Sequence, residues 1–145
     1  MELRILDMDR SLVAQSALRR RLPQIVPLEA WGPRIRLACG ARRFRRFAAE
    51  LAKQLGGSTD HLPSLTMFGS GDFHHVTLAL LARLAVPCNL LVIDKHPDWM
   101  RNIPVLHCGT WLWHATRLPT IHTIYHVGGD IDFDNWYRWF APWRE

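Results

Sequence analysis

Three residues of types that commonly bind metal ions occupy alternate positions directly after the most apolar strand-like segment of the chain. Asp94, His96 and Asp98 follow the run "NLLVI". In an extended chain, side chains at positions i, i+2 and i+4 point to the same face. Pro97 favours extended backbone at His96, because the residue before a proline is pushed away from helical angles. Two carboxylates and one imidazole on one face suit a divalent cation, so the spacing predicts a metal site.

A glycine-rich loop, "GSGDFHH", carries further candidate ligands upstream of this stretch. Glycines let the backbone approach closely, and the two histidines stand where a predicted strand passes into a helix. We expect His74 to be the fourth metal ligand. Asp72 and His75 are further candidates, either as ligands or as groups that orient a ligand. Histidine pairs at a helix start are also typical of purely structural positions, and that alternative stays open.

Together these motifs resemble those of the arginase/agmatinase (ureohydrolase) family, which carries GGDH, then DAHxD, then SxDxDxxDP, and holds two manganese ions. "GSGDFHH" resembles the first motif with Phe73 inserted, so that His74 or His75 takes the ligand role. "DKHPD" is similar to the second, with Lys95 where the family prefers a small residue. The resemblance covers residues 64–135.

A third segment, "LHCGTW", resembles the family's HG-T segment, with Cys108 inserted. The resemblance implies that His107 assists substrate binding or proton transfer. It also implies that Asp98 belongs to the catalytic site as well as to the metal site. The adjacent histidines are similar, too, to those of metal-dependent deacetylases of the same broad fold.

Asp130 and Asp132, in "GGDIDFDN", are open to two interpretations. They could supply the aspartate pair of the family's third motif in a compressed protein. Alternatively, the segment corresponds to the family's intermediate strand after HG-T, which binds no metal. We favour the second interpretation, because no DP follows the aspartates and further strand–helix units should precede the third motif. The chain would then carry one half of a two-metal site.

The resemblance implies a hydrolase that uses metal-activated water to break a C–N bond in a small guanidino or amide compound. Manganese is the expected metal, with zinc and iron as alternatives. Whether this chain turns over substrate stays open. The alternative is a non-catalytic relative or fragment of the arginase fold that works as a binding protein, with its basic N-terminal half as a site for a polyanion.

The elements that must position these residues alternate between strand and helix from residue 64 onward. Strands are predicted at 64–68, 89–94 and 121–127, and helices at 75–84 and 110–117. This alternation is the signature of βαβ units and a parallel sheet. The polar clusters all follow strand ends, where ligands bind in such sheets. The resemblance makes the expected fold a shortened, three-layer α/β/α arrangement of the arginase/deacetylase type.

The N-terminal half contributes no motif. Its clearest element is a helix at 41–55, where apolar residues recur at spacings of three and four. A short edge strand is expected at 4–6 and a weaker helix at 12–21, with an irregular connection between Pro23 and Pro33. We expect a single α/β domain over residues 1–145, with a basic region at 1–60 and the motif-bearing units at 61–145.

The charge is concentrated in the first part of the chain. Residues 1–46 hold 11 arginines against 4 acids, whereas the rest holds 7 basic residues against 9 acids. Because no recognition motif accompanies the arginines, a solvated surface is favoured over nucleic-acid binding. No secretory signal or membrane span is recognisable, and three widely spaced cysteines fit reduced thiols, so we expect a cytoplasmic protein without a membrane partner. The sequence is compatible with assembly into a homo-oligomer.

Overall fold

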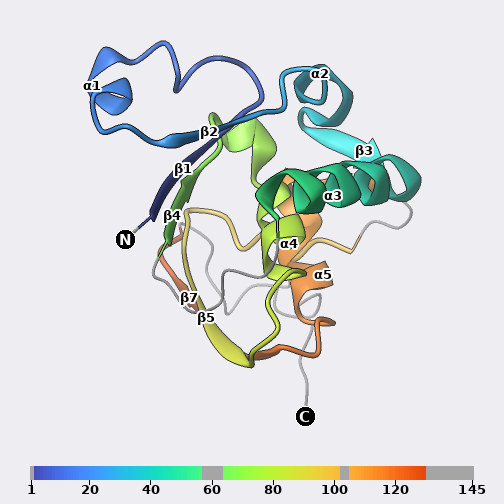
Figure 1. Ribbon diagram of the computed structural model, residues 1–145. Helices are drawn as coiled ribbons and strands as arrows, with labels where there is room; N and C mark the ends of the chain where they lie inside the picture. The colour runs from blue at the N-terminus through green and yellow to red at the C-terminus, as the bar shows by residue number, and fades with distance from the viewer. Residues whose placement is uncertain (1, 57–63, 102–104, 130–145) are drawn as a thin grey trace.

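The structure is a computed structural model that describes residues 2–56, 64–101 and 105–129 (Figure 1). These residues form a mixed α/β fold with parallel strands, in agreement with the predicted class. The strands do not make one continuous sheet in the described part of the chain. They form one sheet of three strands and two sheets of two strands.

The three-stranded sheet is built around the first strand of the chain. Strand β1 (Glu2–Asp7) lies between β2 (Gln24–Pro27) and β4 (Ser64–Met67), and both pairings are parallel. The prediction of an edge strand here was therefore wrong. Residues 4–7 of β1 are buried, so both faces of the strand are covered there.

The segment predicted to be irregular contains β2 and a short helix, α2 (Gly32–Ile35). The expected helix at 12–21 is reduced to α1 (Ser16–Arg19). Local sequence contained little signal for β2, because the strand has only four residues, follows Pro23 and ends on Pro27. Its parallel partner, β1, supplies the hydrogen bonds that make it a strand.

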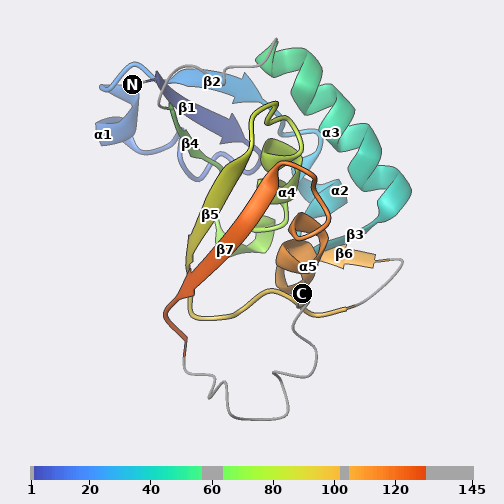
Figure 2. The same cartoon turned by 90° about the horizontal axis from the view of Figure 1, so that it is seen from below.

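The other described strands form two pairs (Figure 2). Strand β5 (Cys88–Ile93) pairs in parallel with β7 (Ile121–Val127), close to the predicted bounds of both. Strands β3 (Ala38–Gly40) and β6 (Val105–His107) were not predicted, and they pair in antiparallel fashion. This pair connects the start of the long helix to the HG-T-like segment.

The helices enclose a core that draws residues from most of the described chain. Helix α3 (Ala41–Leu55) has the predicted bounds, and buries the apolar stripe that contains Phe44, Phe47 and Leu51. Helices α4 (Val76–Leu81) and α5 (Trp111–Ala115) are shorter than predicted and pack against each other. Helix α4 lies in the middle of the molecule, between α3 and the β5–β7 pair (Figures 1 and 2).

No helix within the described ranges is long and apolar enough to span a membrane.

Candidate metal centre

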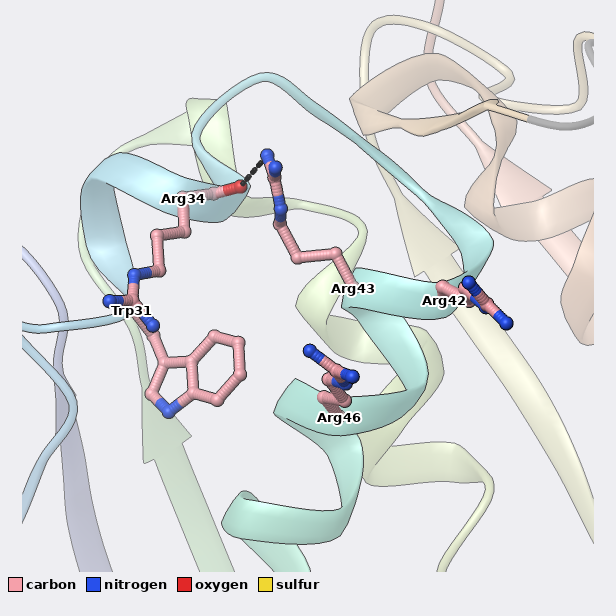
Figure 3. A pocket seen from close by; sticks show the side chains of 5 residues that line it. All are labelled: Trp31, Arg34, Arg42, Arg43 and Arg46. Carbon is pink, nitrogen blue, oxygen red and sulfur yellow. Dashed lines mark hydrogen bonds between the residues drawn. The ribbon is translucent and has the colours of Figure 1, made fainter.

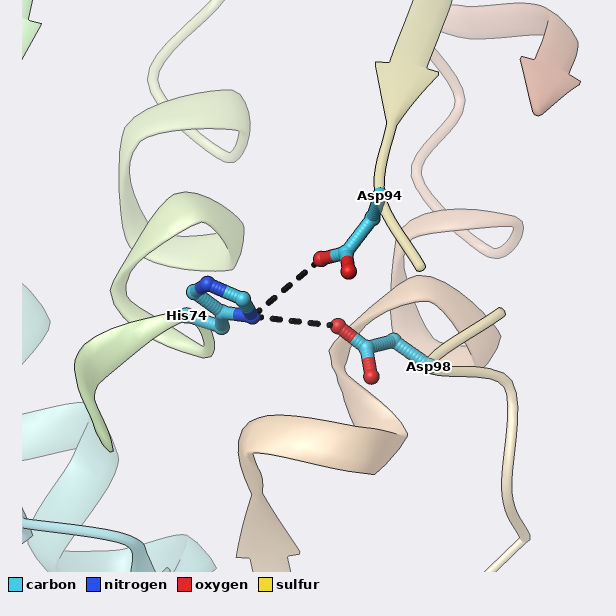
Figure 4. A group of neighbouring side chains, drawn as sticks. All are labelled: His74, Asp94 and Asp98. Carbon is cyan, nitrogen blue, oxygen red and sulfur yellow. Dashed lines mark ion pairs between the residues drawn. The ribbon is translucent and has the colours of Figure 1, made fainter. Parts of the chain in front are cut away.

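Three predicted ligands meet in one place, and we call them the His/Asp cluster: His74, Asp94 and Asp98 (Figure 4). The Nδ1 atom of His74 lies 3.3 Å from Oδ2 of Asp94 and 3.4 Å from Oδ2 of Asp98. One ligand atom from each of the three residues lies within 4.8 Å of the others. Nitrogen and oxygen ligands about 2.1 Å from a tetrahedral metal ion stand about 3.4 Å apart, so these separations fit a bound cation.

The cluster is assembled from the ends of two segments. His74 follows a 3-10 turn, η1 (Gly71–Phe73), and precedes α4. A Cβ atom at Gly71 would stand 3.4 Å from Nε2 of His74, so the imidazole packs directly over this glycine. Asp94 comes directly after β5 (Figure 4). Both ligand-bearing segments therefore follow strands, as predicted, although β4 and β5 belong to different sheets.

Asp98 is the most constrained member of the cluster. It is only 6% exposed, and its backbone has a positive φ of 49°. The indole Nε1 of Trp111 donates a hydrogen bond of 2.7 Å to its Oδ2. Its backbone carbonyl accepts a hydrogen bond of 3.0 Å from the amide of Leu112. The start of α5 thus fixes both the carboxylate and the backbone of this ligand.

The chain between Asp94 and Asp98 is not extended, so the predicted strand-like alternation was wrong. The chain bends at Lys95 and His96, and the amide of His96 donates a 3.1 Å hydrogen bond to Oδ1 of Asp94. A short-range bond of this kind is typical of Asp in turns. The bend brings Asp94 and Asp98 together and leaves the side chain of His96 outside the His/Asp cluster, exposed. Metal binding by His96 stays a prediction.

Asp72 lies outside the cluster as well. Its Oδ2 atom accepts a hydrogen bond of 2.7 Å from Nε of Arg36 and forms an ion pair, also at 2.7 Å, with a terminal nitrogen of the same guanidinium. Its backbone carbonyl also accepts a hydrogen bond of 2.9 Å from the amide of Leu37. The structure therefore gives Asp72 a different partner, the guanidinium that connects the η1 loop to the end of α2.

His75 is fully buried and packs against the ring of Phe44, with ring centroids 6.1 Å apart. The pKa of His75 is lowered to about 4, chiefly by burial; the Ile35 backbone opposes this shift, and repulsion from His107 and His74 adds to it. This imidazole is therefore neutral near pH 7. It faces the core and is not among the three residues of the His/Asp cluster.

His107 precedes a second 3-10 turn, η2 (Cys108–Thr110), and its Nδ1 accepts a hydrogen bond of 3.1 Å from the amide of Gly109. The Thr110 hydroxyl donates to the carbonyl of His107 and accepts from its amide. The structure therefore places His107 in a local turn and not in the cluster. Asp130 and Asp132 lie outside the described residues.

The electrostatics of the cluster favour a positive charge between the carboxylates. The hydrogen bond to Asp98 raises the pKa of His74, burial opposes it, and the charges of Asp94 and Asp98 raise it further. A protonated imidazole can balance the two carboxylates, and a divalent cation can do so more fully. The donor set of one nitrogen and two oxygens suits manganese, zinc or iron.

The sequence did not single out Trp111 as part of this site. Its indole is the donor that holds Asp98, yet nothing in the pattern distinguishes it from the other tryptophans. Trp111 is the last residue of the HG-T-like segment "LHCGTW", and this position was its one recognisable signal in the sequence.

Comparison with known proteins gives little further guidance. No family model matches the chain, and no solved structure matches it. An uncharacterized protein of Thermotoga maritima is 34% identical to the chain over 70 residues. The matched stretch is 46% of this chain and 29% of that protein, so the match spans less than a third of the relative's length.

Proposed function

We propose that the chain binds a divalent metal ion through His74, Asp94 and Asp98 and belongs to the metal-dependent hydrolases of C–N bonds. One observation carries the proposal: side chains from two separate segments converge. Nδ1 of His74 lies 3.3 Å from Oδ2 of Asp94 and 3.4 Å from Oδ2 of Asp98. The expected substrate is a small guanidino or amide compound. The proposed fold is a shortened, three-layer arrangement of the arginase/deacetylase type, and manganese is the expected metal.

Three protein ligands leave a coordination position for water, as in many catalytic metal sites. A bound divalent ion lowers the pKa of such a water to near neutrality and polarises the scissile group. Trp111 holds the Asp98 carboxylate by its Oδ2, and the amide of His96 holds Asp94 by its Oδ1. The chain's own groups thereby orient both carboxylates before an ion arrives, which supports affinity.

The test is the metal content of the chain and of matched variants. Purified protein is stripped with a chelator, incubated with manganese or zinc, dialysed, and analysed by mass spectrometry of the metal. We expect stoichiometric metal in the unmodified chain and loss of metal in His74→Ala and Asp94→Asn. His96→Ala is the matched control, because its side chain is exposed and outside the cluster.

Loss of metal in His96→Ala alone would favour the ligand set expected from the sequence over the one seen in the structure. Unmodified protein that retains no metal would contradict the proposal. Turnover is tested separately by urea or amine release from guanidino and amide compounds. Metal binding without any release would favour the non-catalytic alternative.

A further inference from the structure

A cavity of about 400 Å³ lies between α2 and the first two turns of α3. Its size falls in the range of small-molecule sites. Its lining consists of one tryptophan and four arginines: Trp31, Arg34, Arg42, Arg43 and Arg46 (Figure 3). None of these residues belongs to the His/Asp cluster, so the cavity is a separate feature of the molecule.

The cavity collects positive charge without a counter-charge. In the described part of the chain, arginine–carboxylate ion pairs join Arg4 with Glu2 and Arg36 with Asp72, and none involves the lining arginines. No acidic residue lines the cavity. Four exposed arginines therefore line one concave surface, although the guanidinium of Arg42 points away from the other three (Figure 3). The charges of the lining arginines are available to a ligand.

Two of these guanidinium groups are already positioned by neutral partners. A terminal nitrogen of Arg43 donates a hydrogen bond of 3.1 Å to the backbone carbonyl of Arg34 (Figure 3). The guanidinium of Arg34 lies 5.7 Å from the ring centroid of Trp31. Trp31 itself packs edge-on against Phe47, with centroids 5.8 Å apart, so the wall of the cavity is anchored to the core. Such anchoring reduces the entropy that binding would cost.

The arginines occupy positions that helix stability disfavours. Arg42 and Arg43 lie in the first turn of α3, which contains no acidic residue. Cations there oppose the helix dipole, whose positive end is at the N-terminus. Arg46 stands four residues after Arg42 and three after Arg43, so like charges are neighbours on the helix surface. An anion in the cavity would relieve both effects.

We infer that this cavity binds a small ligand that carries a di- or triphosphate group. Guanidinium forks match phosphate oxygens in pairs, and several of them on one surface suit a group that carries several negative charges. The half-buried Trp31 offers an apolar wall for an attached ring. A pocket of this size fits a small molecule, whereas a nucleic-acid strand needs an extended basic track. The inference does not depend on the proposed metal chemistry.

The test is calorimetric titration of the full chain with inorganic triphosphate, with inorganic phosphate as the weaker reference. Because triphosphate also binds divalent ions, the titrations use chelator-treated protein and are repeated on Asp94→Asn. We expect triphosphate to bind in both, and Arg43→Gln/Arg46→Gln to weaken it about tenfold or more, as expected for lost charged hydrogen bonds. Arg45→Gln is the matched control, an exposed arginine of α3 that does not line the cavity.

A thermal melt separates binding from folding. Without ligand, Arg42→Gln should melt no lower than the unmodified chain, since it removes an unfavourable charge. Equal weakening by Arg45→Gln, or no triphosphate binding at all, would overturn the inference. A single-stranded oligonucleotide that binds more tightly than triphosphate, and depends on Arg45, would also overturn it in favour of a nucleic-acid surface.

Discussion

At the scale of single residues, Asp98 combines several constraints in one position. A left-handed backbone is uncommon for residues other than glycine, but Asp and Asn tolerate it better than most. Burial of a carboxylate is costly unless it is hydrogen-bonded or paired, and Trp111 and His74 supply those partners. A residue that is buried, left-handed and charged at once has few acceptable replacements.

Trp111→Phe removes the hydrogen bond to Asp98 and keeps an aromatic ring in the core. We expect a loss of about 1.5–3 kcal/mol in the free energy of unfolding, because the lost bond is to a charged group. We also expect metal affinity to fall roughly 10- to 100-fold, as for other groups that orient a ligand. Urea unfolding and a metal titration measure the two effects.

Trp113→Phe is the matched control, because Trp113 lies on the same helix and contacts Arg117 instead of the His/Asp cluster. If both variants weaken metal binding equally, the indole of Trp111 has no special part in holding Asp98.

The buried imidazole of His75 makes stability depend on pH. Its pKa is lowered to about 4 in the folded chain, chiefly by burial, whereas that of an exposed histidine is about 6.5. Above pH 6.5 both states are neutral, and below it the unfolded chain gains a proton first. Stability is therefore lost between pH 6.5 and about 4, by about 2 kcal/mol at pH 5 from this residue alone.

Urea unfolding at pH 7 and pH 5 checks this, with His75→Asn expected to lose less stability between the two values than the unmodified chain. His122→Asn changes an exposed histidine and should follow the unmodified chain. The same loss in all three proteins would show that His75 is not the titrating group.

At the scale of elements, α2 is tied to the end of β1 by a close approach of backbone. A Cβ atom at Gly32 would stand 1.9 Å from the carbonyl oxygen of Met8, so no larger residue fits without moving one of the two segments. By contrast, a Cβ atom at Gly40 would meet nothing within 4 Å. The position of α2, and with it the cavity beside α3, depends on this contact.

Gly32→Ala should therefore destabilise the chain by about 3 kcal/mol or more, as expected when an atom is forced into a packed contact. Gly40→Ala should cost less than about 1 kcal/mol, since it only replaces a glycine at a helix N-cap. Thermal and urea unfolding of the two variants measure the difference. Similar losses would show that α2 moves away from Met8 at little cost.

Local sequence patterns predicted the helices and strands that have a clear apolar pattern of their own. Helix α3 has a clear apolar stripe, and β4, β5 and β7 are apolar runs between turn residues, so their bounds came out nearly right. Strands β2, β3 and β6 were missed because each is short and is defined by a partner far away in the chain.

The same distinction holds for the His/Asp cluster. Residue types at strand ends pointed to His74, Asp94 and Asp98, which the structure brings together. The predicted alternation, which placed His96 on the same face, was wrong. The chain bends at Lys95 and His96, where the His96 amide donates a hydrogen bond to the Asp94 carboxylate. Periodicity carries no information about a side-chain-to-backbone bond of this kind. The positions of Trp111 and the lining arginines depend on tertiary packing and could not be predicted.

At the scale of the whole molecule, one face of the β5–β7 pair is apolar and exposed. Leu91 pairs with Tyr125 and Ile93 with Val127, and these four side chains are 54–77% exposed. Parallel strands are usually covered on both faces, and large apolar patches are uncommon on a monomer surface.

This face should therefore bind an uncharged apolar dye such as Nile red. Replacing two of its residues in Leu91→Thr/Ile93→Thr should lower the dye's emission while keeping β-branched residues in the strand. Ile25→Thr/Leu65→Thr alters two separate exposed positions on β2 and β4 and serves as the control. Equal emission from both double variants would show that the four residues do not act as one surface.

The central position of β1 has a consequence for the order in which the chain folds. Its neighbours come from residues 24–27 and 64–67, so one side of β1 stays unpaired until a distant part of the chain is present. Helices such as α3 form within about a microsecond, whereas folds dominated by distant pairings take roughly milliseconds to seconds. During synthesis, β1, which has more buried residues than any other described strand, must therefore wait for β4 to leave the ribosome before its sheet can close.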